Sequence, residues 1–374
     1  MELQISPTMI SWIAELEHTN AQTLANELAP KKVDKFLQGL LSKTTAIQLA
    51  KRANIPFGYL FLQTPPQINL PNIPDLRQTI GAEPLSADFF EILQDIEYKQ
   101  DWFKEYLLDN GNEPLDFVGK FKFSPNLDSK IVVQDIINTL NIDLKNEIKN
   151  LNKDNYFKFL SQEFERIGIL IFKNGVVKNK TNRQLSVAEF RGFALVDKIA
   201  PVVFINGSDS PSAQLFTLVH EVAHIWIGQS GVSSWNQDQA VESFCNKVAA
   251  EFLMPTDIFI QYWQTENSND SIIKLMALFK VSKLAIIIKA VTLGLLSPQE
   301  IHNERAYLKR QEKNTETAGG NFYNTASIRQ SRKFSEVVLN QAVSQHLPLR
   351  VAGQLLNMHA DKVMVFYRNR RGEN

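Results

Sequence analysis

The stretch SPSAQLFTLVHEVAHIWIG, residues 210–228, places the pattern HEVAH inside a segment that has both the start and the stop signals of a helix. Ser210 is a good N-cap, Pro211 suits the first helical position, and Gly228 suits the residue after the last turn. We therefore predict one helix over 211–227. In such a helix, two histidines four residues apart project from one face, one turn above the other.

Two imidazoles in this arrangement, those of His220 and His224, can bind one zinc ion at about 2.0–2.1 Å. Glu221 follows the first histidine and points beside the metal, where it can take a proton from a zinc-bound water. The pattern therefore predicts a zinc site of the hydrolase type with Glu221 as the general base. A chance HExxH match on a solvated helix face is the structural alternative.

The apolar residues of the same segment predict how this helix packs. At about 100° per residue they gather on the side opposite the two histidines. We therefore expect the apolar side to pack on a sheet and the histidines to face a cleft. The apolar set is Leu215, Leu218, Val219, Val222 and Trp226.

Zinc catalysis uses three protein ligands and one open position, and the next predicted helix, 238–253, offers two candidates for the third ligand. Its apolar positions recur at i, i+3 and i+4, which indicates a half-buried helix. Glu242 lies at one edge of this apolar stripe and Glu251 at the other, so spacing alone leaves both open. Cys245 lies within the stripe, and we interpret it as a buried core residue.

Strands and helices around the motif predict the fold class. A helix at 156–167 runs into a strand at 168–172, and further strands are expected at 190–196 and 201–206. Strands that are followed by helices indicate an α+β domain. The last of these strands is a candidate edge for an extended substrate, with a purely structural strand as the alternative.

The rest of the chain is predicted to be mainly helical. Five short helices are expected in the first 65 residues, which is typical of a helix-turn-helix module or of a helical docking bundle. The proline-rich segment QTPPQINLPNIPD that follows marks a linker. We therefore predict an α+β, predominantly helical multidomain protein. The predicted divisions are 1–65, 66–150, 151–298 and 299–374.

Charge and composition are those of an ordinary globular protein. The 40 Lys and Arg residues balance 40 Asp and Glu residues, so the total charge does not point to nucleic acid. From residue 300 onward there are 12 Lys and Arg against seven Asp and Glu. This C-terminal region is therefore basic, which indicates either an acidic partner or a solvated surface.

Three features predict a cytoplasmic protein without a membrane partner. Cys245 is the single cysteine, so an intrachain disulfide is excluded. The first 18 residues lack the basic segment and apolar run of a signal peptide. The most apolar stretch, 284–296, is interrupted by Lys289 and is too short to span a bilayer.

Two segments around the histidine motif carry a longer pattern. They are RGFALVDKIAPVVFINGSDSPSAQLFTLVHEVAHIWIG, at 191–228, and VESFCNKVAAEFLMP, at 241–255. Both resemble the ImmA/IrrE family of metallopeptidases, in which a zinc-binding HExxH helix is followed by a helix similar to the second segment. The resemblance covers roughly 160–300 and implies a zincin-like metallopeptidase domain with a small sheet, flanked by helical regions.

The resemblance also implies a role for each residue of the motif. His220 and His224 become zinc ligands, and Glu221 becomes the catalytic base. Glu242, which opens the second segment, becomes the third ligand. Zn²⁺ is therefore the cofactor that the resemblance implies.

The two ends of the chain are similar to those of the longer family members. IPFGYLFLQTPP, at 55–66, resembles the end of their degenerate Xre-type helix-turn-helix domain, and GGNFYNTASIRQSRKF, from Gly319, resembles their C-terminal region. The resemblance implies DNA contact through the first domain, in which the segment 30–41 takes the recognition position. The basic residues of this segment that would meet phosphates are Lys31, Lys32 and Lys35.

The family resemblance implies proteolysis of a regulatory protein, commonly a helix-turn-helix repressor. Long members also occur as antitoxin-like partners of nuclease toxins, so a toxin is a second expected partner. The competing hypothesis is a DNA-binding regulator or antitoxin-like protein in which the zinc domain is structural or sensory. A third hypothesis, a helical scaffold with an accidental HExxH, predicts no stoichiometric zinc.

Overall fold

The chain divides by its internal contacts into two compact units. The first contains the described residues up to Pro65 together with the beginning of helix α5 (Ala87–Asp109), as far as Gln94, and the second contains the described residues from Asp95 onward. Most of the proline-rich linker and of the segment that begins at Gly319 lies outside the described residues. The computed structural model describes residues 2–16, 19–53, 55, 57–62, 64–65, 85–149, 151–233, 239–264, 267–311 and 329–371.

The first unit is a small helical body with a two-stranded sheet. Its helices enclose a core of buried hydrophobic residues, which includes Met9, Leu24 and Phe36. The expected five short helices are present, the last as a 3₁₀ helix. The sheet was not predicted, because strands of three residues are too short to show a period. The elements are β1 (Glu2–Gln4), α1 (Pro7–Leu16), α2 (Ala21–Leu28), α3 (Val33–Leu37), β2 (Leu40–Ser42), α4 (Lys43–Arg52) and η1 (Phe57–Phe61).

The segment 30–41, expected in the recognition position, contains only the five-residue helix α3. Gly39 follows with φ +85°, and an added Cβ there would lie 1.9 Å from the Ile5 carbonyl oxygen. The chain then enters β2, which pairs antiparallel with β1. Lys31, Lys32 and Lys35 are exposed. The helix-turn-helix assignment stays a prediction.

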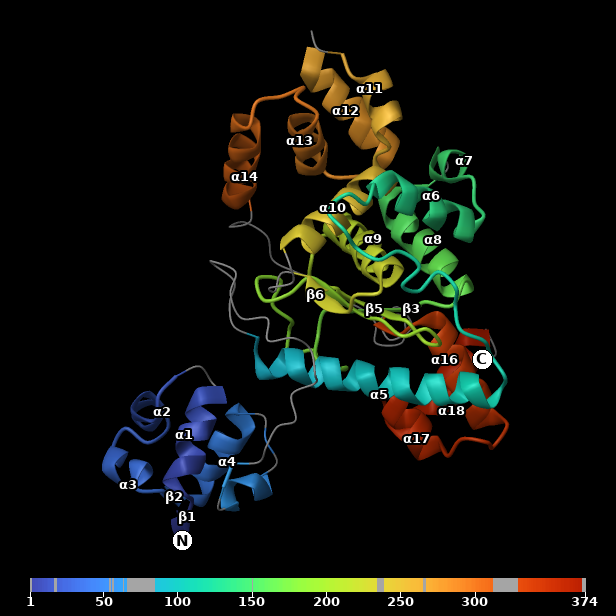
Figure 1. The fold of residues 1–374 in the computed structure, drawn as a ribbon. Helices are drawn as coiled ribbons and strands as arrows, with labels where there is room; N and C mark the ends of the chain where they lie inside the picture. The colour runs from blue at the N-terminus through green and yellow to red at the C-terminus, as the bar shows by residue number, and fades with distance from the viewer. Residues whose placement is uncertain are drawn as a thin grey trace. The chain divides into compact units, whose positions relative to one another are not determined.

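The second unit contains a four-stranded sheet surrounded by helices (Figure 1). The strand order is β3-β5-β4-β6; β3 and β5 are parallel, and β4 is antiparallel to both of its neighbours. The strands are β3 (Leu170–Asn174), β4 (Gly192–Leu195), β5 (Val202–Asn206) and β6 (Gly231–Ser233). Its first helix is the part of α5 (Ala87–Asp109) from Asp95 onward. The next helices, as far as the one that follows β6, are α6 (Ser129–Leu140), α7 (Leu144–Lys149), α8 (Lys153–Arg166), α9 (Pro211–Ile227) and α10 (Gln239–Leu253).

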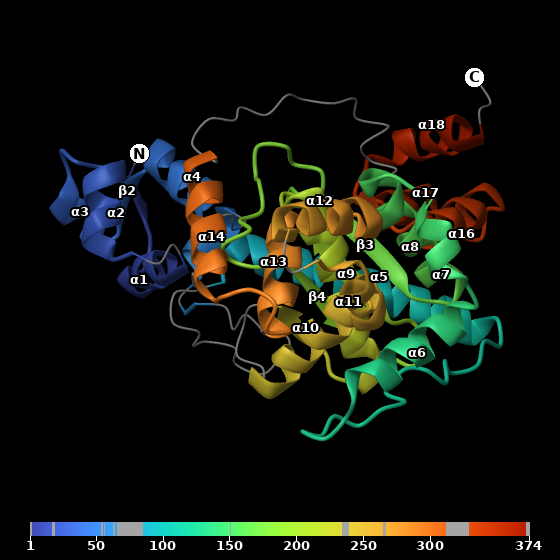
Figure 2. The same cartoon turned by 90° about the horizontal axis from the view of Figure 1, so that it is seen from above.

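The remaining helices form two groups. Helices α11 to α14 follow α10, and α16 to α18 close the described chain. In Figures 1 and 2, α14 and the α16–α18 group lie on opposite sides of the unit. The bounds are α11 (Thr256–Tyr262), α12 (Ser268–Phe279), α13 (Lys283–Thr292), α14 (Gln299–Gln311), α16 (Arg332–Val343), α17 (Leu349–Leu355) and α18 (Ala360–Arg371).

The two faces of the sheet pack against different helices. Because side chains alternate along a strand, Val203 and Ile205 of β5 share a core with α9, while Phe204 points to the opposite face. On that opposite face, Phe172 of β3 packs against Phe334 of α16, with ring centroids 5.5 Å apart. The sheet is therefore buried on both faces, with α9 on one side of it.

The architecture is α+β and predominantly helical, as predicted from the sequence. None of the helices in the described part of the chain combines the length and the apolar composition that a bilayer-spanning segment needs. Residues of α6 belong to the same hydrophobic core as α9 and α10, which gives the segment before residue 150 a packing role. The four-part division of the chain stays a prediction.

The turn between β4 and β5 is fixed by Asp197. Its Oδ1 accepts hydrogen bonds from the backbone N–H groups of Ile199 and Ala200, at 2.8 and 3.0 Å, and its Oδ2 accepts one from Lys104 Nζ at 2.6 Å. Burial raises the pKa of this carboxyl, but the hydrogen bonds outweigh burial and leave the pKa below its usual range. The ionised carboxylate therefore stabilises the turn.

We expect Asp197→Asn to lower the free energy of unfolding by about 1–3 kcal/mol near neutral pH, because charge-assisted hydrogen bonds are lost. A depressed folded-state pKa contributes stability that is present above the unfolded-state value of about 3.9 and is lost as pH falls through the folded-state value. The difference between wild type and variant should therefore shrink in acid. Urea unfolding from pH 7 to pH 3 measures it, and a difference independent of pH would contradict this account.

Candidate metal centre

Helix α9 has the predicted bounds, Pro211–Ile227. The side chain of Ser210 accepts a hydrogen bond from the Ala213 N–H, and Gly228 ends the helix in the left-handed region at φ +70°. The N–H of Gln229 then donates to the carbonyl oxygen of His224 at 3.0 Å. The HExxH pattern therefore lies inside a helix that is capped at both ends.

The helix packs on the sheet as expected, but most of it is buried, and this includes both histidines; Glu242 beside them keeps 22% of its side chain exposed. His220 is 3% exposed, and His224 and Glu221 are 0% exposed. Trp226, expected on the sheet side, instead stacks on Phe117 and donates its indole N–H to Asp135 of α6 at 2.9 Å. The helix packs on β4 and β5, on α8 and on α10, and it keeps partial exposure in its first turn and at Phe216.

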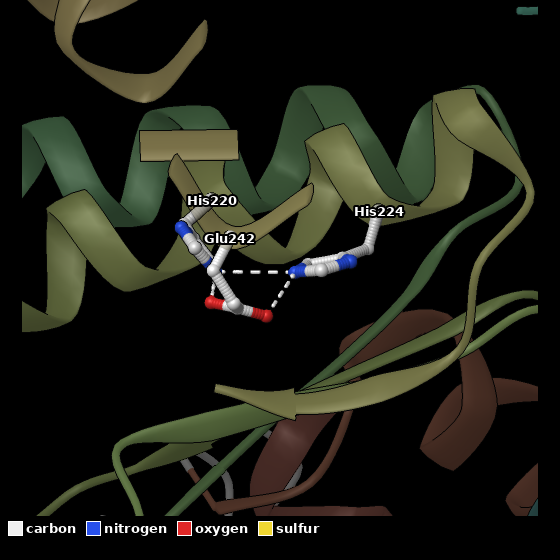
Figure 3. Close-up of side chains that lie close together, drawn as sticks. All are labelled: His220, His224 and Glu242. Atoms are coloured by element: carbon white, nitrogen blue, oxygen red, sulfur yellow. Dashed lines mark hydrogen bonds and ion pairs between the residues drawn. The ribbon is translucent and has the colours of Figure 1, made fainter. Parts of the chain in front are cut away.

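Helix α10 supplies the carboxylate. Its apolar stripe is buried as predicted, including Phe244, Cys245 and Val248. Glu242 in the first turn reaches both histidines: Glu242 Oε2 lies 3.1 Å from His220 Nε2, and Glu242 Oε1 lies 3.3 Å from His224 Nε2. Figure 3 shows the two rings and the carboxylate pointing toward one another.

Glu251, the other candidate that spacing left open, is engaged elsewhere. One of its oxygens accepts a hydrogen bond from the Thr256 N–H at 3.0 Å, at the start of α11. The other lies 2.7 Å from Nζ of Lys289, a lysine that is only 8% exposed. Glu251 therefore forms a buried ion pair between α10 and α13, and among the described residues it is not part of the histidine cluster.

The three converging side chains fit a tetrahedral metal ion. The two Nε2 atoms lie 3.1 Å apart, and one ligand atom from each of the three residues lies within 4.8 Å of the others. A zinc ion bonded at about 2.0–2.1 Å separates its ligand atoms by roughly 3.4 Å in tetrahedral geometry. Two imidazole nitrogens and one carboxylate oxygen are also a donor set of catalytic zinc sites. The site thus matches a zinc ion in both spacing and chemistry.

The charges of the cluster follow from its burial and its mutual contacts. Burial raises the pKa of Glu242, but hydrogen bonds from the two imidazoles outweigh burial and lower the pKa to about 2. Burial lowers the pKa of His224. At His220 burial also lowers the pKa, yet the hydrogen bond to Glu242 and the charge of Glu221 leave it raised. Glu242 is therefore ionised at neutral pH, which suits a cation ligand.

Glu221 lies on the sheet side of α9 rather than among the three converging groups. An ideal Cβ built on Gly192 of β4 would lie 3.3 Å from Glu221 Oε1, so the carboxylate is close to the strand backbone. Glu221 is thus adjacent to His220 in sequence, is buried, and is separate from the cluster His220, His224 and Glu242.

Strand β5, considered as an edge for a substrate, lies inside the sheet. It is hydrogen-bonded to β3 on one side and to β4 on the other, so its backbone has no unpaired edge. Among the described strands of this sheet, β3 and β6 are the edges. The substrate-edge hypothesis for 201–206 is therefore wrong, and the structural alternative holds.

Comparison with protein families agrees with this geometry. Residues 164–290 match the family model Peptidase_M78, the IrrE N-terminal-like domain. The matched domain runs from the end of α8 into α13 and contains both α9 and α10, so it supports the resemblance to the ImmA/IrrE family and a metallopeptidase of that type. A search of curated proteins finds no match. The first unit lies outside the matched IrrE-like domain.

Proposed function

We propose that the IrrE-like domain is a zinc-dependent peptidase in which His220, His224 and Glu242 hold the metal and Glu221 is the general base. The observation that carries this proposal is the convergence of two Nε2 atoms and one carboxylate from two successive helices, at 3.1–3.3 Å from one another. In the IrrE-like domain, such a donor set is most simply a catalytic metal site.

Each residue of the chain then has a defined task. The two imidazoles and Glu242 fix the cation, which when bound supplies a Lewis acid that polarises a carbonyl group and acidifies a water molecule. Glu221 accepts the proton of the attacking water and afterwards donates it to the leaving amine. Glu221 is fully buried beside His220, so bulk solvent does not reach its carboxylate. The proton that the carboxylate accepts is therefore kept for the leaving amine and is not lost to solvent.

The substrate class follows from the family resemblance. We propose a regulatory protein, in the first place a helix-turn-helix repressor, because the domain resembles peptidases that act on such proteins. The peptide bond of the repressor would be cut by the water that Glu221 deprotonates. The first unit and the basic C-terminal helices are then candidates for recognition of the substrate rather than for the chemistry.

Metal dependence of cleavage tests this function. The purified chain, as prepared, after chelation, and after chelation followed by zinc, is incubated with repressors encoded near its gene, and products are identified by mass spectrometry. We expect cleavage that chelation removes and zinc restores. Absence of cleavage together with tight binding of DNA or of a nuclease toxin would instead favour a regulator or antitoxin-like protein. A chain that binds no stoichiometric metal would contradict the proposal.

A further inference from the structure

Gly192 occupies the point at which the sheet comes closest to the motif helix. It pairs with Ile205 of β5, and Ala194, two residues further on the same face, shares a hydrophobic core with α9. Gly192 is absent from the site residues predicted from the sequence. A glycine inside an apolar strand is nevertheless a known signal of a close backbone approach.

There is no room for a side chain at this position. An ideal Cβ on Gly192 would lie 2.6 Å from Thr217 Cγ2, 2.8 Å from the carbonyl oxygen of Phe204, and 3.3 Å from Glu221 Oε1. The φ angle of Gly192 is outside the left-handed region, so any residue could adopt the backbone conformation. Space, and not conformation, is therefore what requires glycine here.

We propose that Gly192 is a positioning residue for Glu221: because β4 carries no side chain at this point, the carboxylate of the base can lie against the strand. This inference rests on the proposed function, since it assigns a task to a residue that does not touch the substrate. It adds a strand residue to a site so far built from two helices.

The three neighbours of an added methyl group at Gly192 differ in how far they can move. The Phe204 carbonyl belongs to the backbone of β5, an inner strand of the sheet, so its 2.8 Å contact must be relieved by a shift of β4 at residue 192 that carries the methyl group toward α9. The other two neighbours, Thr217 and Glu221, lie one turn apart on α9 and are the groups that must give. Helix α9 as a whole is held by α8 and α10, so the side chains of Thr217 and Glu221 take up the displacement.

We expect the metal ligands to keep their positions when a methyl group is added at Gly192. His220 and His224 point to Glu242 on α10 (Figure 3), whereas the nearest atoms to an added Cβ at Gly192 belong to Thr217, Phe204 and Glu221. A methyl group at Gly192 should therefore displace the base while the metal remains bound. The contact of 3.3 Å requires Glu221 Oε1 to move by a few tenths of an ångström, so the expected loss of rate is smaller than the roughly 10²-fold cost of a 1 Å misplacement.

The test is a double-mutant cycle of Gly192→Ala and Glu221→Gln, measured as kcat for repressor cleavage and as zinc per chain. We expect Gly192→Ala to lower kcat measurably, though by less than the roughly 10²-fold cost of a 1 Å misplacement, to retain zinc, and to cause no further loss of kcat in the Glu221→Gln background. Gly58→Ala is the control, because a Cβ there meets nothing within 4 Å. An unchanged kcat in Gly192→Ala, or the same loss in both backgrounds, would overturn the inference.

A second variant separates positioning from folding. Thr217→Ser removes the methyl group that a Cβ on Gly192 would meet at 2.6 Å, so Gly192→Ala/Thr217→Ser should fold more readily than Gly192→Ala alone. We expect the double variant to keep zinc and still lose kcat, while Thr217→Ser alone stays active; restored kcat would assign Gly192 to packing only.

If the wild type cleaves nothing, the proposed function fails on that control. A crystal structure of the double variant then decides, and an unmoved Glu221 carboxylate would overturn the inference.

Discussion

Glu221→Gln is expected to lower kcat for peptide hydrolysis by about 10²–10⁴-fold, the range that general acid–base catalysis contributes, and to leave the metal in place. Glutamine has nearly the same shape as glutamate, so the packing around this fully buried side chain is conserved. The amide cannot accept the proton of the attacking water. The loss should therefore appear in kcat with little change in KM.

Zinc content and kcat, measured on the same preparation, check this result. The variant should bind zinc in the same ratio as the wild type, because Glu221 is not part of the cluster formed by His220, His224 and Glu242. It should also be at least as stable, since a buried charge has been removed. A variant that retains wild-type kcat would show that another group acts as the base.

Removing one of the converging ligands should have a different signature. Glu242→Ala and His220→Ala are each expected to weaken zinc binding by more than about 100-fold, because loss of a ligand exceeds the 10–100-fold cost of losing a supporting group around a metal site. Activity should disappear together with the metal. Stoichiometry after dialysis, with titration against a zinc chelator of known affinity, measures both changes.

Glu251→Ala is the matched control on the same helix. Its carboxylate pairs with Lys289, which is buried, at 2.7 Å, and breaking a buried pair by removing one partner costs about 3–5 kcal/mol. We therefore expect this variant to bind zinc normally but to unfold at lower urea concentration. If Glu251→Ala lost zinc while Glu242→Ala kept it, Glu251 and not Glu242 would be the third zinc ligand.

Local features of the sequence predicted the parts of the site that lie within one helix. Ser210, Pro211 and Gly228 fixed the ends of α9 because capping depends on residues next to the helix terminus. The spacing of His220 and His224 fixed their common face because helical geometry is local. The apolar stripe of α10 was predicted for the same reason, and the structure buries it.

Contacts between distant segments could not be predicted from the periodicity. Residue spacing left Glu242 and Glu251 equivalent, since both lie at the edge of one stripe, and only the family resemblance chose between them. The structure separates the two through Lys289, 38 residues after Glu251, which engages that carboxylate. Likewise, the sequence of a strand does not show which strands pair with it. In the structure β5 pairs on both sides and is not an edge strand.

The sequence by itself therefore determined a capped helix with two histidines on one face, a following half-buried helix with two carboxylates, and an α+β fold. The tertiary structure decided which carboxylate meets the histidines, that both histidines are buried, and that β4 lies against Glu221 at a residue without a side chain. The physical reason is one of range: capping and helical spacing act over a few residues, whereas the ion pairs and close packing that complete the site join segments tens of residues apart.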